Sequence, residues 1–149
     1  MKVSDDPEAI LITRSLGSCI GVAVYDPRVR VGGLLHYLLP ESWNPDKAIN
    51  NPFMSADTGI PLLFKSCYQL GAKKGRMVVK IAGGSQIMDA TEVFSIGQRN
   101  HGALREIFFR NNVMVDAEDI GGSVARTMRL SIATGEVSVK VPGQDYKLL

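Results

Sequence analysis

The sequence has 149 residues, nearly half of them apolar, which is enough for one compact domain and too few for two, so we expect a single domain over residues 1–149. Its 17 basic and 15 acidic residues give a net charge of +2 and are scattered along the chain, which argues against nucleic acid or an anionic membrane as a partner. No segment has the apolar length of a signal peptide or a membrane span, so we expect a cytoplasmic protein whose two cysteines stay reduced.

The first three predicted strands are short apolar segments over residues 9–13, 20–26 and 34–39. The sequence Asp-Pro-Arg-Val at residues 26–29 favours a tight turn between the second and third strands. If the turn is centred between residues 27 and 28, residues whose numbers sum to 55 lie opposite each other. Cys19 is then expected to face His36, unless a bulge at the glycine pair 32–33 shifts the register.

A glycine-containing turn connects the first two strands. Gly17 and Ser18 lie in this turn, where several free backbone N–H groups and one side chain can point at the same spot. Cys19 follows directly, so its thiol is well placed for attack on a substrate. Thr13, at the end of the preceding strand, can supply a hydroxyl that orients a histidine ring.

The middle of the chain contains an irregular segment and the first predicted helix. Residues 41–53 include two prolines and several asparagines, so we expect no regular structure there and a position on the surface as a lid or rim. Residues 57–71 have helical periodicity, with Pro61 early and Gly71 as the stop. Cys67 lies on the apolar face of this helix and is expected to be buried.

A second helix is predicted over residues 95–112. Ser95 and Gln98 have the spacing of a capping box at its start. Asn100 lies within the apolar stripe of this helix, where its amide must find partners, so we interpret it as structural scaffolding beside the site. His101 lies at the border of the stripe and is expected to be partly solvated.

Four further strands are predicted over residues 77–82, 113–118, 128–133 and 136–141. Gly135 lies between the last two and can adopt the positive φ of a tight turn, which predicts a hairpin. Many strands with two main helices indicate an α+β fold in which helices pack on a sheet.

The pairing of Cys19 with His36 is typical of a cysteine hydrolase. The thiolate is the nucleophile, and a cysteine with its usual pKa of about 8.5 is mostly protonated at neutral pH. A neighbouring imidazolium can stabilise the thiolate and protonate a departing amine, and the neutral ring can then activate water. Neither a metal nor another cofactor is expected, because the two cysteines and two histidines lack the spacing of a metal site.

A structural interpretation of the same two residues is also open at this point. A free cysteine is among the most buried residue types, and a histidine within an apolar segment is commonly a satisfied core residue.

Five separated motifs, in this order, resemble the chemoreceptor glutamine deamidase CheD family. They are TRSLGSCIGVAVYDP, GGLLHYLLP, KIAGGSQI, SIGQRN and VDAEDIGGSVAR, and the resemblance extends from about Ile10 to Val139. The sequence departs from the family pattern at Arg14, where an apolar residue is usual, and at Ala125, where glycine is expected.

The resemblance implies a Cys-His-Thr triad that falls here on Cys19, His36 and Thr13. It implies a layered α/β/β fold with mixed β-sheets flanked by two main helices, similar to the catalytic domain of cytotoxic necrotizing factor. The implied reaction converts selected glutamines of the cytoplasmic region of methyl-accepting chemotaxis receptors to glutamates, with release of ammonia through a thioester. The implied partners are these receptors and the phosphatase CheC, and we expect a monomer.

In this hypothesis the N–H of Cys19 and a backbone donor around Gly17 and Ser18 hold the oxyanion. Two alternatives are a non-enzymatic chemotaxis adaptor that binds the receptor or CheC, and hydrolysis of methyl esters on receptor glutamates by the same thiol.

Overall fold

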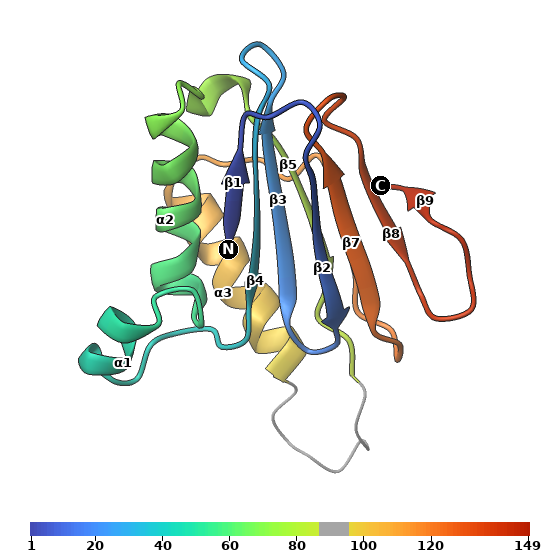
Figure 1. Ribbon diagram of the computed structural model, residues 1–149. Helices are drawn as coiled ribbons and strands as arrows, with labels where there is room; N and C mark the ends of the chain where they lie inside the picture. Colours follow the sequence, from blue (N-terminus) through green and yellow to red (C-terminus); the bar gives the residue numbers. More distant parts are fainter. Residues whose placement is uncertain (87–95) are drawn as a thin grey trace.

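The computed structural model describes residues 1–86 and 96–149 of the chain. In this part, helices cover one face of a five-stranded sheet and a four-stranded sheet covers the other face, as Figure 1 shows. The predicted α+β class and its layered arrangement are therefore confirmed. The similarity to cytotoxic necrotizing factor stays a prediction.

The first sheet has the strand order β1-β4-β3-β5-β6 and the second has the order β2-β7-β8-β9. The strands of the first sheet are β1 (Lys2–Ser4), β3 (Ile20–Asp26), β4 (Val31–Tyr37), β5 (Val78–Gly83) and β6 (Ala117–Ile120). Those of the second are β2 (Ile10–Leu16), β7 (Arg126–Ser131), β8 (Val137–Lys140) and β9 (Lys147–Leu148). The helices are α1 (Pro45–Asn50), α2 (Ala56–Gln69), α3 (Ile96–Arg110) and the short 3-10 helix η1 (Lys74–Arg76). Strands β5 and β6 pair in parallel, so the first sheet is mixed, and the second sheet is antiparallel.

Two apolar cores lie on opposite faces of the first sheet. One packs α2 and α3 against the sheet, and the other fills the space between the two sheets. Strand β3 is buried along its whole length because both of its faces are covered. The adjacent glycines of β4 allow this close packing. A Cβ on Gly32 would lie 2.6 Å from Ile132 beside the second sheet, and one on Gly33 would lie 2.7 Å from Leu63 of α2.

Both predicted main helices and the predicted hairpin are present. Cys67 is fully buried on α2, as expected. Gly135 has a φ of 75° between β7 and β8, which pair in antiparallel fashion. Ser95, the expected first residue of the capping box, lies outside the described residues. The short edge strands β1 and β9 were not predicted, because three and two residues are too few for a period to be read.

The prediction of no regular structure in residues 41–53 is wrong, because α1 forms there. The Asn44 side chain accepts a hydrogen bond of 2.8 Å from the backbone N–H of Asp46, which is the bond of a helix N-cap. Pro45 then occupies the first helical position, where the missing N–H has no consequence. The Asn-Pro pair therefore starts a helix here instead of preventing one.

The predicted register of β3 and β4 is wrong by two residues. The observed partners have numbers that sum to 57, so Gly21 and not Cys19 lies opposite His36. The turn is longer than expected, because residues 27–30 all belong to it and Arg30 adopts a left-handed φ of 54°. No bulge interrupts this pairing. A shift of two residues keeps the side chains on the same faces, so the expected face of His36 is unchanged.

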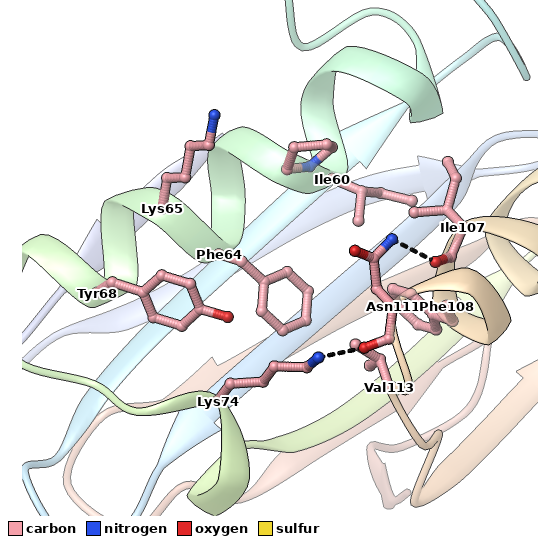
Figure 2. A pocket seen from close by; sticks show the side chains of 10 residues that line it. Ile60, Phe64, Lys65, Tyr68, Lys74, Ile107, Phe108, Asn111 and Val113 are labelled. Carbon is pink, nitrogen blue, oxygen red and sulfur yellow. Dashed lines mark hydrogen bonds between the residues drawn. The ribbon is translucent and has the colours of Figure 1, made fainter.

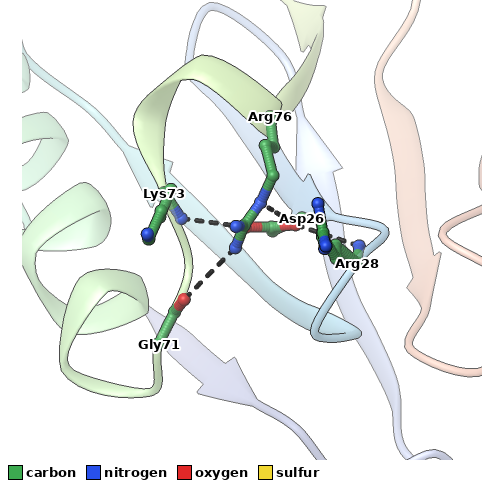
Figure 3. Close-up of polar contacts among 5 residues, drawn as sticks. All are labelled: Asp26, Arg28, Gly71, Lys73 and Arg76. Atoms are coloured by element: carbon green, nitrogen blue, oxygen red, sulfur yellow. Dashed lines mark hydrogen bonds and ion pairs between the residues drawn. The ribbon is translucent and has the colours of Figure 1, made fainter.

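The end of β3 is fixed by a buried carboxylate (Figure 3). Asp26 is fully buried and accepts hydrogen bonds from the backbone N–H groups of Arg28 and Lys73, at 3.0 and 2.8 Å. The Arg76 guanidinium of η1 donates to both carboxylate oxygens, with the shortest bond at 2.6 Å. Asp26 therefore ties the β3–β4 turn to the segment between α2 and β5.

Candidate functional site

The candidate site lies where several chain segments end together, at the lower end of the molecule in Figure 1. The turn at residues 17–19 leads from β2 of the second sheet to β3 of the first. Strand β4 ends at Tyr37 beside it, and α3 begins in the same region. Residues from both sheets and from one helix can therefore meet at this turn.

Thr13 and His36 are in direct contact. The Thr13 hydroxyl lies 2.9 Å from Nδ1 of His36, a hydrogen bond that joins β2 of one sheet to β4 of the other. The other ring nitrogen, Nε2, is buried and has no hydrogen-bond partner among the described residues. If Thr13 accepts from Nδ1–H, the lone pair of Nε2 is free to take a proton.

Cys19 lies on the same side of the first sheet as His36. The Cys19 side chain is partly buried and packs against the apolar core between the sheets. His36 pairs with Gly21, where an added Cβ would contact Leu16 and Met128 of the second sheet at 2.8 and 3.0 Å. Because directly paired residues share a face, the His36 ring is also directed into the space between the sheets.

The turn that carries Cys19 is held by hydrogen bonds to three of its consecutive carbonyl groups. The Gly17 carbonyl accepts from the backbone N–H of Ser85 at 2.8 Å, and the Cys19 carbonyl accepts from the N–H of Gly84 at 2.9 Å. Between them, the Ser18 carbonyl accepts from Nδ2 of Asn100 at 2.9 Å. The turn is therefore fixed on one side by the segment after β5 and by α3.

The segment before this turn is irregular in a way that sequence reasoning did not anticipate. The pairing of β2 with β7 shifts between Thr13 and Leu16, and Ser15 adopts a left-handed φ of 58°. A non-glycine residue in this conformation is strained by about 1–3 kcal/mol, and such strain is concentrated at functional sites. The irregularity lies between the hydroxyl and the thiol of the candidate site.

Burial favours the neutral forms of both reactive groups. It raises the pKa of the Cys19 thiol, an effect that the Cys19 backbone N–H partly opposes. It lowers the pKa of the His36 imidazole. In the free protein both the Cys19 thiol and the His36 imidazole therefore favour their neutral forms, in contrast to the expected thiolate and imidazolium. No hydrogen bond joins Cys19 to His36 among the described residues.

Comparisons with known proteins identify relatives over almost the whole chain. A family model described as "CheD chemotactic sensory transduction" matches residues 38–141. A protein of Syntrophus aciditrophicus named "Probable chemoreceptor glutamine deamidase CheD 1" is 56% identical over 149 residues, which cover 99% of this chain and 93% of the relative. A protein of Anaeromyxobacter dehalogenans named "Probable chemoreceptor glutamine deamidase CheD 2" is 47% identical over 94% of this chain and 89% of its own length.

The chain belongs to the CheD family. A third relative, from Solibacter usitatus, is 42% identical over 99% of this chain and 88% of its own length, and is named "Probable chemoreceptor glutamine deamidase CheD". The family match begins two residues after His36, so it carries no information on the roles of Thr13, Cys19 and His36.

Part of the candidate site was not identified from the sequence. Gly84 and Ser85 hold the turn that carries Cys19 through their backbone N–H groups. A Cβ on Gly83 would lie 2.2 Å from the Cys19 carbonyl oxygen, so the absence of a side chain is what lets the two segments touch. A glycine pair at the end of a predicted strand was the available signal for this close approach.

A pocket of about 180 Å³ between α2 and α3 is separate from the candidate site (Figure 2). Its walls are mostly apolar, and it contains none of the predicted site residues. Within residues 1–86 and 96–149, no group of three or more His, Cys, Asp or Glu side chains is arranged to hold a metal ion. No helix in the described part of the chain is long and apolar enough to cross a membrane.

Proposed function

We propose that this chain is a protein-glutamine deamidase that uses Cys19 as its nucleophile and acts on chemotaxis receptors. The observation that carries the proposal is the hydrogen bond between Thr13 and His36 Nδ1, which leaves Nε2 buried and unpartnered among the described residues, on the side of the sheet that Cys19 occupies. Membership of a family whose members bear the name chemoreceptor glutamine deamidase supports the substrate class.

In the first half of the reaction, Nε2 of His36 takes the proton of the Cys19 thiol as sulfur attacks the carboxamide carbon of glutamine. The oxyanion is held by the N–H of Cys19 and by a second backbone donor around Gly17 and Ser18. The C–N bond then breaks, and the departing nitrogen takes the proton from His36 to leave as ammonia.

In the second half, a water molecule attacks the thioester while His36 takes one of its protons. The C–S bond breaks, the sulfur recovers its proton from His36, and the carboxylic acid that is released ionises to glutamate by losing its proton to the solvent. Thr13 accepts a hydrogen bond from Nδ1–H throughout, so that Nε2 is the ring nitrogen that gains and loses the proton. The low pKa that burial gives His36 suits this role, because the ring is then unprotonated and ready to act as a base at neutral pH.

The cellular setting follows from the substrate. The substrate glutamines are expected in the cytoplasmic helical region of the receptors, so the chain is proposed to act in the cytoplasm. It is also proposed to act as a single-domain monomer and without a cofactor. The phosphatase CheC is proposed as a regulatory partner.

The test is to incubate the protein with a receptor cytoplasmic fragment and to follow both intact mass and free ammonia. We expect the mass to rise by the difference between OH and NH₂ at each modified glutamine, with one ammonia released per site. Loss of a methylene together with release of methanol from a methylated fragment would instead indicate an esterase. An unchanged mass of both the unmethylated and the methylated fragment would contradict the proposal and would favour the alternative of a non-enzymatic adaptor.

A further inference from the structure

Asn100 connects the two chain segments that carry Cys19 and His36. It is fully buried in the first half of α3. Its single NH₂ group donates to the carbonyl of Ser18 and to the carbonyl of Leu38, both at 2.9 Å. Ser18 directly precedes Cys19, and Leu38 is the second residue after His36.

The bond to Ser18 fixes the direction of the Cys19 N–H. The carbonyl of Ser18 and the N–H of Cys19 belong to one peptide group, and no peptide bond among the described residues is cis. In a planar trans peptide these two groups point in opposite directions. Because Asn100 holds the carbonyl toward α3, the N–H of Cys19 points away from α3.

Among the described residues, only the donor half of the Asn100 amide is satisfied. Its Oδ1 atom is buried without a hydrogen-bond partner there, which is unfavourable by about 1–3 kcal/mol. The contacts of this side chain are therefore the two bonds that its NH₂ group donates. The NH₂ group must face the two carbonyls, since the opposite amide orientation would place oxygen against oxygen.

Two further contacts bring α3 to this position. A Cβ on Gly97 would lie 2.5 Å from the carbonyl oxygen of Gly84, so the helix backbone rests directly on the segment that holds the nucleophile turn. The Tyr37 hydroxyl donates to the backbone carbonyl of Asn100 at 2.7 Å and ties the helix to β4. The Tyr37 hydrogen bond involves the backbone carbonyl of the same helical residue and not its side-chain amide.

We propose that Asn100 is a positioning residue of the reaction, which orients the Ser18–Cys19 peptide so that its N–H can stabilise the oxyanion. This inference rests on the proposed deamidase function. Asn100 touches neither the substrate nor the reacting atoms, and it acts through the peptide that it holds.

The test compares Asn100→Asp and Asn100→Leu with Tyr37→Phe and with the unchanged protein. The Asp variant preserves the shape of the side chain but loses both donors when ionised. Tyr37→Phe removes a buried hydrogen bond at the same helical residue and serves as the matched control. Each protein is assayed for kcat and KM of ammonia release from a receptor fragment, for the rate at which iodoacetamide alkylates Cys19, and for thermal stability.

We expect kcat of either Asn100 variant to fall by about 100-fold, as for the loss of an oxyanion donor, while KM stays within about threefold. Alkylation forms no oxyanion, so its rate should stay within about threefold in the same variants. Tyr37→Phe should lower stability while keeping kcat within about threefold.

Two results would overturn the inference while the unchanged protein releases ammonia. One is a kcat in both Asn100 variants as high as in Tyr37→Phe. The other is a parallel loss of deamidation and alkylation, which would show a general structural role. If the unchanged protein releases no ammonia, the proposed function itself fails, so the two failures are distinguishable. If one Asn100 variant does not fold, the same comparison is made with the other Asn100 variant alone.

Discussion

Thr13 contributes one hydroxyl to the candidate site, and in the proposed mechanism this hydroxyl accepts a hydrogen bond from Nδ1–H of His36. We predict that Thr13→Ala lowers kcat for ammonia release by on the order of 10- to 100-fold, because the ring loses its orientation and its preferred tautomer. Thr13→Ser keeps the hydroxyl and should retain most of the activity. Equal losses in the two variants would show that the hydroxyl has no such role.

The lowered pKa of His36 leads to a second prediction at the residue level. Burial holds this pKa below the ordinary value of 6.5, so the ring is neutral at pH 7 and becomes protonated only in more acidic solution. As a base, His36 must be neutral, so kcat/KM should be near its full value at pH 7 and fall on the acid side with a midpoint below 6.5. Initial rates between pH 5 and pH 8 measure this midpoint, and a value above 6.5 would contradict the assignment.

Part of the residue-level account could be predicted from the sequence. Cys19 after a glycine turn, and a histidine on a later strand, were identified from their local patterns and from the family resemblance. The contact between Asn100 and Ser18 joins residues 82 positions apart, and no local pattern encodes such a contact. The sequence predicted that the buried amide of Asn100 needs partners and lies beside the site as scaffolding, but it could not identify the partners.

At the level of elements, the strand pair β3 and β4 shows why a register is harder to predict than a strand. Both strands were identified from their apolar residues, yet the longer turn moved every pair by two positions. The alternation of side chains has a period of two, so the predicted face survived while the predicted partner of His36 did not. Similarly, α1 was missed because Asn and Pro are common both in loops and at helix starts.

Asp26 gives a prediction for the end of β3. Burial alone would raise the pKa of this carboxyl, but hydrogen bonds from Arg76, Lys73 and Arg28 hold it below the ordinary value of 3.8. The ionised carboxylate therefore stabilises the fold fully above pH 3.8, and this contribution is lost as the pH falls through the lowered pKa. We predict that Asp26→Asn lowers the free energy of unfolding by about 3 kcal/mol at pH 7, because it leaves Arg76 without its charged partner.

Urea denaturation at pH 7 and at pH 3 measures this effect. The difference between Asp26→Asn and the unchanged protein should shrink at the lower pH. Asp145→Asn, at an exposed position, is the control and should change the unfolding free energy by less than about 0.5 kcal/mol. A similar small effect for Asp26→Asn would show that its hydrogen bonds contribute little.

For the whole molecule, the distance between the two sheets decides whether the site can form. Thr13 comes from the second sheet and His36 from the first, so their hydrogen bond spans the interface. The absence of a side chain at Gly21, opposite His36, lets Leu16 and Met128 approach the first sheet. The sequence predicted an α+β fold, but it could not assign strands to two sheets, because that division depends on packing between distant segments.

We predict that Gly21→Ala lowers the free energy of unfolding by about 1–3 kcal/mol and also reduces kcat, because the added methyl group must push the two sheets apart. The same substitution at Gly102 of α3, where a Cβ meets nothing within 4 Å, is the control. Gly102→Ala should raise the free energy of unfolding by about 0.5–1 kcal/mol and leave kcat unchanged. Thermal denaturation and ammonia release measure both effects, and an undisturbed Gly21→Ala protein would show that the sheet spacing is adaptable.

The nucleophile assignment is the claim on which the reaction depends, and ammonia release by Cys19→Ala tests it most directly. The variant is compared with the unchanged protein and with Cys67→Ala, which removes the other, fully buried thiol of the chain. We predict no detectable ammonia and no mass change of the receptor fragment with Cys19→Ala, and substantial activity with Cys67→Ala. Ammonia release by folded Cys19→Ala at the rate of the unchanged protein would contradict the account.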